Sequence, residues 1–551
     1  MKTFLQHPDN QTNPEWWRGA TIYQIYPRSY QDSNGDGIGD LKGIIDRLPY
    51  IAGLGVDAVW LSPFFTSPMK DFGYDVSDYC DVDPMFGTLD DFKHLVAKAH
   101  ELGLRVIIDQ VLSHTADIHP WFVESSSSRD NPKADWYVWG DPKEDGSPPN
   151  NWLSIFIGSA WQWNARREQY YMHNFLTSQP DLNLHNREVR AALFDVLRFW
   201  LDIGVDGFRL DTVNFYMHDA QLRDNPARGR PSDNDCGVVP TNPYSWQKHL
   251  YDKSQPENLQ LLQEMRAVLD EYPGITTVGE LGDENSYELQ LAYTADGDKL
   301  HTAYTFDLLS EQKSPLYLHE VLDKFAQGGE DSWACWSLGN HDTPRLATRW
   351  NGDPQALRAY LSMQLSLRGS PCLYQGEELG LTEGVLTFEQ LRDPYGISMW
   401  PEAGGRDGCR TPMVWQVGAA NAGFSDAEPW LPVMQNHLPL AVDQQDADSG
   451  SLLNYYRDWL QARRKLAVLW SGSFELLAAH PQVLAYIRRD AKSGRTLLCV
   501  MNLSGQTAEY ALPANVLAKE LADVPQTADS KLLDKEVLSL QPWGTLFAWI
   551  D

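Results

Sequence analysis

The chain has little cysteine and no long hydrophobic run. Six cysteines occur among 551 residues and no two of them form a C-x-x-C pair, so the sequence predicts neither a zinc site nor a disulfide framework. We expect free thiols in a reducing compartment, at Cys80, Cys236, Cys335, Cys372, Cys409 and Cys499. The stretch "MKTFLQHPDNQTNPEWW" has no apolar core of signal-peptide length, and no segment is apolar enough to span a membrane, so a cytoplasmic location is the expectation.

Basic residues are also in deficit, with 45 Lys and Arg against 75 Asp and Glu and a formal net charge of −30. Nucleic acid and anionic lipid are not attracted to such a surface, so neither is expected as a partner. The expected partner is a neutral or cationic small molecule, and the charge itself indicates a well-solvated exterior suited to a salty habitat. Aromatic residues are abundant, with 21 Trp and 24 Tyr. Most are expected to be packing, but flat aromatic faces also stack on sugar rings.

The first part of the chain alternates between amphipathic helix patterns and short β-branched runs. Each helical stripe ends near a glycine, and Thr88 with Asp91 predicts a capping box at the start of one of them. Runs that are apolar on both faces and alternate with helices are typical of a parallel sheet covered by helices. The candidate strands are 21–27, 57–63, 105–111, 207–211, 276–280, 302–307, 333–340 and 371–376. Eight strands predict a closed (β/α)8 barrel, with a doubly wound sheet as the alternative.

The length allows about two to four domains. We assign 1–113 to the first part of the barrel and 114–182, which interrupts the alternation, to a small domain inserted after the third strand. Residues 183–469 complete the barrel and include an irregular insertion at about 381–445. Alternating runs separated by polar turns predict a C-terminal antiparallel β-domain over 470–551.

Polar residues follow several of the predicted strands at the point where each strand ends. Asp109 ends the third strand, Asp211 the fourth, Glu280 the fifth, and Asp342 closes the seventh. Because a (β/α)8 barrel carries its active site at the C-terminal ends of its strands, these side chains should meet at one mouth. One such acid alone is more often a cap or an ion-pair partner. The convergence of Asp211, Glu280 and Asp342 predicts a site.

Paired carboxylates that flank a bond are what glycoside cleavage requires, one as nucleophile and one as proton donor. Arg209 is two residues from Asp211 in "GFRLDTVNFY", so on a strand both side chains point to the same side. We therefore expect Arg209 to keep Asp211 ionised as the nucleophile. Glu280 has no basic residue in the adjacent "VGELGDEN", which suits an acid that desolvation and negative charge keep partly protonated.

The segments "DQVLSH", "QPDLN", "GFRLDTVN", "VGE" and "NHD" resemble, in order, the signature segments of glycoside hydrolase family 13, the α-amylase family. "GRDGCRTPMVW" at 405–415 is similar to the oligo-1,6-glucosidase and α-glucosidase branch of that family. The resemblance covers nearly the whole chain and implies a (β/α)8 barrel, an inserted B domain and a C-terminal β-sandwich. It implies a retaining, exo-acting α-glucosidase that also transfers glucose to sugar or alcohol acceptors.

The resemblance also implies residue roles. Asp211 is the nucleophile, Glu280 the general acid/base, and Asp342 the third carboxylate, which orients sugar hydroxyls. Tyr74 stacks on the terminal glucose, while Asp71 and Arg410 hold its far hydroxyl. The remaining residues of the expected pocket are His114 and His341, which bind hydroxyls of the transferred sugar, and Phe156 and Gln179, which line it.

Thr212 follows the expected nucleophile. In this branch of the family, the residue at this position correlates with the type of α-glucosidic bond that the enzyme cleaves. Members that cut α-1,6 bonds tend to carry valine, whereas those that prefer α-1,4 bonds tend to carry threonine or alanine. Thr212 therefore predicts a preference for maltose and sucrose-like substrates over isomaltose.

Two segments bear on metal binding. Many amylases carry a calcium-ligating asparagine where this chain has Ser113, so that calcium site is expected to be missing. "DSNGDGIGD" instead supplies five oxygen ligands for a hard cation, from Asp32, Asn34, Asp36, the Ile38 carbonyl and Asp40. It resembles the calcium loop of this branch, so we expect one structural Ca²⁺, with Mg²⁺ as the alternative, and no organic cofactor.

Alternative functions remain on the same scaffold. An oligo-1,6-glucosidase and a sucrose- or maltose-isomerising or trehalose-forming glucosyltransferase are compatible with these residues, although the "RLDRD" stretch of isomaltulose-forming relatives is not present. A non-catalytic relative such as the ectodomain of a transporter heavy chain is disfavoured, because all three acids are present. A monomer and a homodimer are both compatible with the sequence.

Overall fold

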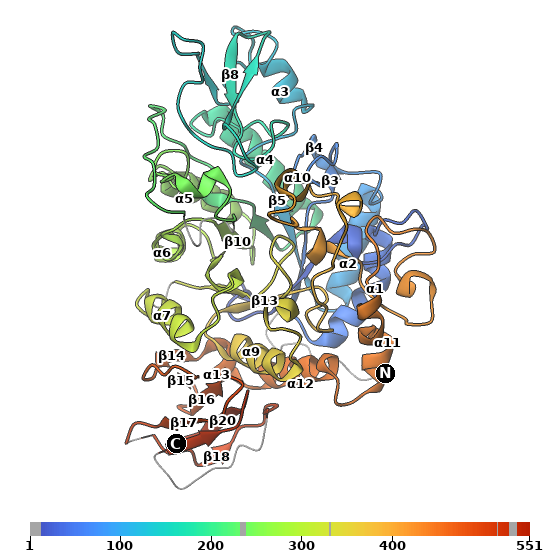
Figure 1. Cartoon of the computed structure of the whole chain (residues 1–551), viewed down its shortest axis with the longest axis vertical. Helices are drawn as coiled ribbons and strands as arrows, with labels where there is room; N and C mark the ends of the chain where they lie inside the picture. The colour runs from blue at the N-terminus through green and yellow to red at the C-terminus, as the bar shows by residue number, and fades with distance from the viewer. Residues whose placement is uncertain (1–12, 232–237, 330–331, 515, 528–536, 551) are drawn as a thin grey trace.

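The computed structural model describes residues 13–231, 238–329, 332–514, 516–527 and 537–550. Figure 1 shows a barrel in the middle of an elongated molecule, with a small domain beyond one end and a β-domain beyond the other. The five cysteines in these ranges are free thiols, as expected, whereas Cys236 lies outside the described residues. No helix in the described ranges is long and apolar enough to cross a membrane.

Eight parallel strands form the barrel. Their order is β11 (Thr302–Thr305), β10 (Thr276–Leu281), β9 (Gly207–Leu210), β5 (Arg105–Gln110), β2 (Ala58–Leu61), β1 (Ile22–Ile25), β13 (Ser370–Tyr374) and β12 (Cys335–Ser337). A parallel bridge between Ala303 and Ala334 joins the two ends of this order. All eight predicted strands are confirmed, and the closure excludes the doubly wound alternative.

Helices cover the outside of the barrel, and short-range signals in the sequence set where they begin and end. Asp40 caps the first of them by accepting a hydrogen bond from the Gly43 amide, and the predicted Thr88–Asp91 capping box is present. Helix α4 (Arg187–Ile203) ends at Gly204, whose φ of 109° favours glycine. The helices are α1 (Leu41–Leu54), α2 (Leu89–Glu101), α4 (Arg187–Ile203), α5 (Asn258–Leu269), α6 (Ser286–Thr294), α7 (Pro315–Ala326), α8 (Leu346–Arg349), α9 (Pro354–Ser366) and α12 (Leu452–Lys465).

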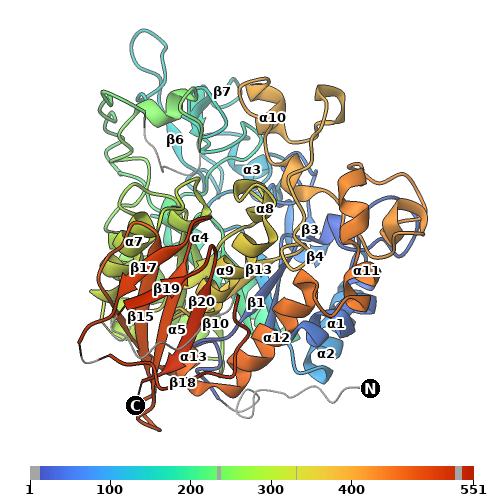
Figure 2. The same ribbon diagram turned by 60° about the horizontal axis from the view of Figure 1, so that its bottom comes forward.

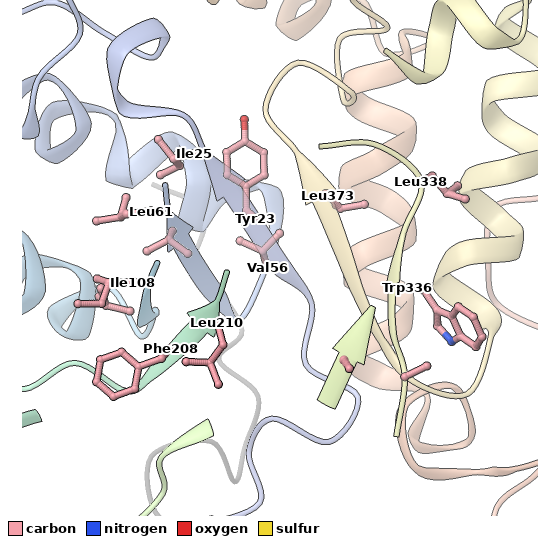
Figure 3. Close-up of a cluster of buried hydrophobic side chains, with 14 of the residues drawn as sticks. Tyr23, Ile25, Val56, Leu61, Ile108, Phe208, Leu210, Trp336, Leu338 and Leu373 are labelled. Atoms are coloured by element: carbon pink, nitrogen blue, oxygen red, sulfur yellow. The ribbon is translucent and has the colours of Figure 1, made fainter. Parts of the chain in front are cut away.

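The alternation of side chains along each strand separates the outer core from the barrel interior. Phe208 and Leu210 on β9 belong to the large cluster between the strands and the helices, part of which Figure 3 shows. Trp60 and Tyr304 belong to a different cluster, inside the barrel. Arg209 alternates with Phe208 and Leu210, so β9 directs it, and Asp211 beyond it, into the barrel interior.

The segment between β5 and α4 forms the small domain at the top of Figure 1. It contains α3 (Pro120–Ser125) and an antiparallel sheet in the order β6 (Trp139–Gly140), β8 (Gln169–Met172) and β7 (Trp161–Asn164). The stretch after β13 carries short helices, among them α10 (Pro394–Met399) and α11 (Val442–Ala447). Figure 2 shows α10 at the same end of the molecule as β6 and β7.

The C-terminal part is antiparallel, as predicted. One sheet has the order β14 (Ser473–Leu476), β15 (Val483–Arg489), β16 (Thr496–Asn502), β20 (Thr545–Trp549) and β18 (Glu520–Leu521), and β17 (Ala508–Ala511) pairs with β19 (Val537–Leu540). A separate apolar cluster lies between the two sheets and includes Leu498, Val500, Tyr510 and Leu538. This part therefore has its own core and forms a β-sandwich.

Candidate active site

A pocket opens at the C-terminal ends of the barrel strands, with a volume of about 130 Å³. Nine of the twelve residues predicted for the catalytic and sugar-binding roles line it: Asp71, Tyr74, His114, Phe156, Gln179, Asp211, Thr212, Glu280 and Asp342. The other three, Arg209, His341 and Arg410, are fully buried and bond to residues of this pocket. Residues from far-apart segments of the chain therefore meet around a single hollow.

Arg209 ties the two central carboxylates together. Its Nη1 lies 2.6 Å from Asp211 Oδ1 and 2.9 Å from Asp109 Oδ1, and its Nη2 lies 2.6 Å from Glu280 Oε2. The strand register explains this geometry, because Asp109 on β5 and Val278 on β10 are the neighbours of Arg209. Asp211 and Glu280 consequently approach the same cation from two adjacent strands.

Glu280 has no basic residue beside it in the sequence, but in the structure Arg209 reaches it from the adjacent strand. Burial raises the pKa of Glu280 to about 7, with the Asp211 and Asp342 carboxylates adding to this and Arg209 opposing it. Burial also raises the pKa of Asp211 to about 7, against the same arginine. Arg209 therefore does not single out Asp211 as the ionised member of the pair, and the two acids titrate as a unit.

Asp342 is the carboxylate that stays most strongly ionised. Burial alone raises its pKa, but His341, Arg410 and Arg406 more than offset this and hold its pKa well below the ordinary value. Arg410 Nη2 is 2.8 Å from Asp342 Oδ1, and His341 Nε2 is 3.2 Å from Asp342 Oδ2. Gln24 Nε2 donates to His341 Nδ1 at 2.7 Å, so Nε2 is the ring nitrogen that carries a proton toward Asp342.

Arg406 is a pocket residue that the sequence did not single out. Its Nη2 lies 2.7 Å from both Asp71 Oδ1 and Asp393 Oδ1, and its Nη1 lies 3.4 Å from Asp342 Oδ1. Arg406 thus stands beside Asp71, where we expected Arg410, whereas Arg410 bonds to Asp342 and to the His341 carbonyl. Both arginines lie in "GRDGCR", so the segment was identified but not the side chain that reaches Asp71.

The inner end of the pocket is closed by hydrogen-bonded polar groups. Gln179 Nε2 donates to Asp71 Oδ2 at 3.0 Å, and His114 Nε2 donates to the Tyr74 carbonyl at 2.9 Å. The Tyr74 ring stacks on His341, with centroids 5.4 Å apart and an angle of 7° between the planes. These groups are fixed in place and offer donors and acceptors suited to sugar hydroxyls.

A run of aromatic rings forms another wall. Tyr395 lies 5.7 Å from Phe156, which lies 5.8 Å from Phe175, and Phe175 lies 5.8 Å from Phe215. Of these four pocket residues only Phe156 was predicted. Phe215 stands in "GFRLDTVNFY", four residues after Asp211, and this closeness to the nucleophile in the sequence could have indicated that it lines the pocket.

Thr212 connects the two central acids. Its amide donates to Glu280 Oε2 at 3.1 Å, and its Oγ1 lies 3.3 Å from Asp211 Oδ2. The backbone at Thr212 is left-handed, with φ 40° and ψ 48°, which is strained for a β-branched residue. Ser113 Oγ is 3.2 Å from Thr212 Oγ1, so the serine that departs from the amylase pattern supports this strained residue.

The loop predicted to bind a cation folds as a series of turns. Asp32 Oδ1 accepts from the Asn34 and Gly35 amides, and Asn34 Oδ1 accepts from the Asp36 amide. Asp40 caps α1. The described residues hold no group of three or more His, Cys, Asp or Glu side chains arranged for a metal. The predicted ligands Asp32, Asp36 and Asp40 therefore do not form such a group in this structure, although all five predicted ligands would supply oxygen, the donor atom that a hard cation prefers.

The barrel, the inserted domain and three acids around one pocket together define a glycoside hydrolase. Residues 24–472 match the family model described as alpha amylase, catalytic domain, and residues 474–547 match that described as maltogenic amylase, C-terminal domain. The chain belongs to the α-amylase family, glycoside hydrolase family 13.

Relatives that cover nearly the whole chain carry related names. A probable alpha-glucosidase of Rhizobium meliloti (strain 1021) is 54% identical, covering 99% of this chain and 98% of the relative. An oligo-1,6-glucosidase of Heyndrickxia coagulans is 35% identical, covering 94% and 97%. The crystal structure of the alpha-glucosyl transfer enzyme XgtA matches with a TM-score of 0.93 at 51% identity, covering 97% of this chain and 99% of that one. The trehalulose synthase MutB matches with a TM-score of 0.86 at 32% identity, covering 97% and 100%.

Proposed function

We propose that the protein is a retaining, exo-acting α-glucosidase that releases glucose from the non-reducing end of short α-glucosides. The observation that carries this proposal is the pairing of Asp211 and Glu280 through Arg209 in one pocket, with Asp342 beside them. Two carboxylates that share one cation are close enough to act on the same glycosidic bond. The names of the relatives at 54% and 35% identity support the same class.

The reaction has two steps. Asp211 attacks the anomeric carbon of the glucose while the bond to the leaving oxygen breaks, and Glu280 transfers its proton to that oxygen. Glu280 then takes a proton from water, whose oxygen attacks the anomeric carbon and breaks the bond to Asp211. When a sugar or an alcohol replaces water, the product is a new α-glucoside, so transglucosylation accompanies hydrolysis.

The inner end of the pocket fits one terminal glucose. Asp71, Gln179 and Arg406 are hydrogen-bonded to one another there, and His114 lies against Gln179. Such charged and polar groups bind hydroxyls, and their bonds to one another suit a closed end that accepts a single sugar. The protein therefore acts at chain ends, and Tyr74, Phe156 and His341 complete the walls around the ring.

We infer a preference for α-1,4 linkages from Thr212, whose hydroxyl lies beside the nucleophile. The alternative, an oligo-1,6-glucosidase, is the name carried by several relatives. Initial rates on maltose, sucrose and isomaltose decide between them, and faster cleavage of isomaltose would contradict the preference.

A second candidate is a glucosyltransferase that isomerises sucrose or maltose. The fold similarity to the trehalulose synthase MutB and to the isomaltulose synthase of Erwinia rhapontici favours it. Chromatography of the products from sucrose separates the two: free glucose and fructose indicate the hydrolase, whereas an isomeric disaccharide as the main product indicates the transferase.

We also propose that the 32–40 loop binds one Ca²⁺, or Mg²⁺, as a structural ion. Asp32, Asn34, Asp36, the Ile38 carbonyl and Asp40 would hold it, and the ion would stiffen the loop that precedes α1. Thermal unfolding with EDTA and after added CaCl₂ tests this. A lower melting temperature with EDTA that calcium restores supports the site, and a melting curve indifferent to both contradicts it.

The proposed function is tested by replacing each central acid. Asp211→Asn and Glu280→Gln should fold with melting curves close to that of the unchanged protein and lose maltose hydrolysis by about 10³-fold or more. Glu101→Gln, on the exposed end of α2, is the matched control and should keep full activity. An active Asp211→Asn variant would refute the nucleophile assignment.

A further inference from the structure

Hydrogen-bond donors reach both carboxylate oxygens of Glu280. The Thr212 amide and Arg209 Nη2 lie 3.1 and 2.6 Å from Oε2, and the Tyr304 hydroxyl lies 3.0 Å from Oε1. A backbone amide and a guanidinium can only donate, whereas a phenol can donate and accept. The contact at Oε1 therefore differs in kind from the two at Oε2.

Strand register fixes Tyr304 in this position. Glu280 on β10 pairs with Tyr304 on β11, so both side chains leave the sheet on the same side. Tyr304 is 2% exposed, its ring lies 6.2 Å from the Trp60 ring, and Arg209 Nη2 donates to its oxygen at 2.8 Å. Because Arg209 is a donor only, the hydroxyl proton of Tyr304 is directed at Glu280. Burial raises the pKa of this phenol well above its ordinary value, so it keeps its proton.

Resting on the proposed function, we infer that Tyr304 is a positioning residue that donates a hydrogen bond to Oε1 of the acid/base Glu280 and stabilises the carboxylate that forms when Glu280 gives up its proton. As the bond between the anomeric carbon and the leaving oxygen breaks, the proton of Glu280 passes to that oxygen. The O–H of Tyr304 donates to the charged Oε1, as Arg209 and the Thr212 amide do to Oε2.

Tyr304 exchanges no proton with Glu280 over the whole cycle. In the second step Glu280 takes a proton from water or from an acceptor alcohol, while the hydroxyl of Tyr304 keeps its own proton. Arg209 and the Thr212 amide favour only the ionised carboxylate, since both can only donate. Tyr304 adds a third donor, at the other carboxylate oxygen, and so fixes the orientation of the Glu280 carboxyl group.

The test is Tyr304→Phe, which removes the hydroxyl and keeps the ring. Cleavage of maltose, whose leaving oxygen needs a proton, should lose about 10- to 100-fold in kcat/KM. Cleavage of α-D-glucosyl fluoride, whose leaving group needs little protonation, should change by less than about threefold, because the nucleophilic step is untouched. Loss of a donor to the ionised carboxylate should also raise the pKa of Glu280 and move the basic limb of the maltose profile up by about one pH unit.

Tyr216→Phe is the matched control. Tyr216 is also a buried tyrosine near the mouth of the barrel, and its hydroxyl has no hydrogen-bond partner among the described residues. This variant should leave both rates and the pH profile unchanged. If Tyr304→Phe does not fold, Tyr304→Met fills a similar volume without a hydroxyl and should show the same split between the two substrates.

Two outcomes would overturn the inference. An equal loss on maltose and on α-D-glucosyl fluoride with an unmoved pH profile would show that the hydroxyl only supports the fold, and unchanged kinetics would show that it does nothing for Glu280. Failure of the proposed function looks different, because the unchanged protein would then cleave neither substrate. Tyr304 can therefore lose its role while the α-glucosidase assignment stands.

Discussion

Arg406 bridges Asp71 and Asp342 across the inner end of the pocket, with nitrogen to oxygen distances of 2.7 and 3.4 Å. The two acids come from distant parts of the chain, one from the segment after β2 and the other from the turn after β12. Asp393 Oδ1 also contacts this guanidinium, at 2.7 Å from Arg406 Nη2. A planar cation with several donors is suited to such a position, because it fixes two acids relative to each other and to a sugar between them.

Replacing Arg406 should therefore damage sugar binding. Arg406→Lys keeps the charge but cannot reach three carboxylates at once, so kcat/KM for maltose should fall by about 10- to 100-fold. Asp71→Asn should give a similar loss, and the double variant should lose little more than either single variant, because both remove the same contact. Steady-state kinetics on the four proteins measure this. Additive losses would show that the two residues act independently.

The raised pKa values of Asp211 and Glu280 predict the pH dependence of activity. Activity needs one proton on the pair, with Asp211 ionised and Glu280 protonated. Burial raises the pKa of each acid to about 7, so the pair loses its first proton below that value and its second above it. We expect a bell-shaped profile of kcat/KM for maltose with its maximum near neutral pH. A profile that stays flat from pH 5 to pH 9 would contradict the shared titration.

Thr212→Val should shift linkage preference. Valine keeps the volume of Thr212 but removes the hydroxyl that contacts Asp211 and Ser113. The ratio of isomaltose to maltose hydrolysis should rise by about tenfold. Thr276→Val, at the start of β10, is the control because its hydroxyl is buried without a partner among the described residues. A ratio that moves equally in both variants would remove Thr212 from the account of specificity.

Glu377 predicts a dependence of stability on pH that is separate from catalysis. Burial raises its pKa to about 8, and among the described residues neither of its carboxylate oxygens has a hydrogen-bond partner. A carboxyl whose pKa is raised by folding stabilises the fold below its unfolded pKa, and this contribution is lost as the pH rises toward the folded value, at roughly 1.4 kcal/mol per pH unit. The melting temperature of Glu377→Gln should therefore exceed that of the unchanged protein by an amount that grows as the pH rises from 5 to 8. A difference in melting temperature that stays constant over this range would contradict the burial of an ionisable acid.

The fold was accessible from the sequence because its signals are local. Helical stripes ending at glycines such as Gly204, a capping box at Thr88, and eight apolar runs were enough to predict the barrel. Strand alternation also placed Arg209 and Asp211 on one side of β9. These features depend on neighbours within a few residues along the chain.

The missed features depend on contacts between strands. Arg209 reaches Glu280 because β9 and β10 pair in a particular register, and no window of sequence around Glu280 contains that arginine. Tyr304 beside Glu280 has the same origin on β11. Whether Arg406 or Arg410 reaches Asp71 depends on the conformation of the 405–410 turn. The spacing of four residues between the two arginines does not determine that conformation. The contacts that could not be predicted from the sequence therefore depend on strand register and loop conformation rather than on residue type.

The central claim is that Asp211 forms a covalent bond to glucose while Glu280 serves the leaving group. The most direct test is to incubate the protein with 5-fluoro-α-D-glucosyl fluoride, whose sugar forms a slowly hydrolysed adduct, and to map the labelled peptide by mass spectrometry. We expect the added mass on Asp211, together with release of α-glucose, rather than β-glucose, from maltose. A label on any other residue, or β-glucose as the first product, would contradict the account.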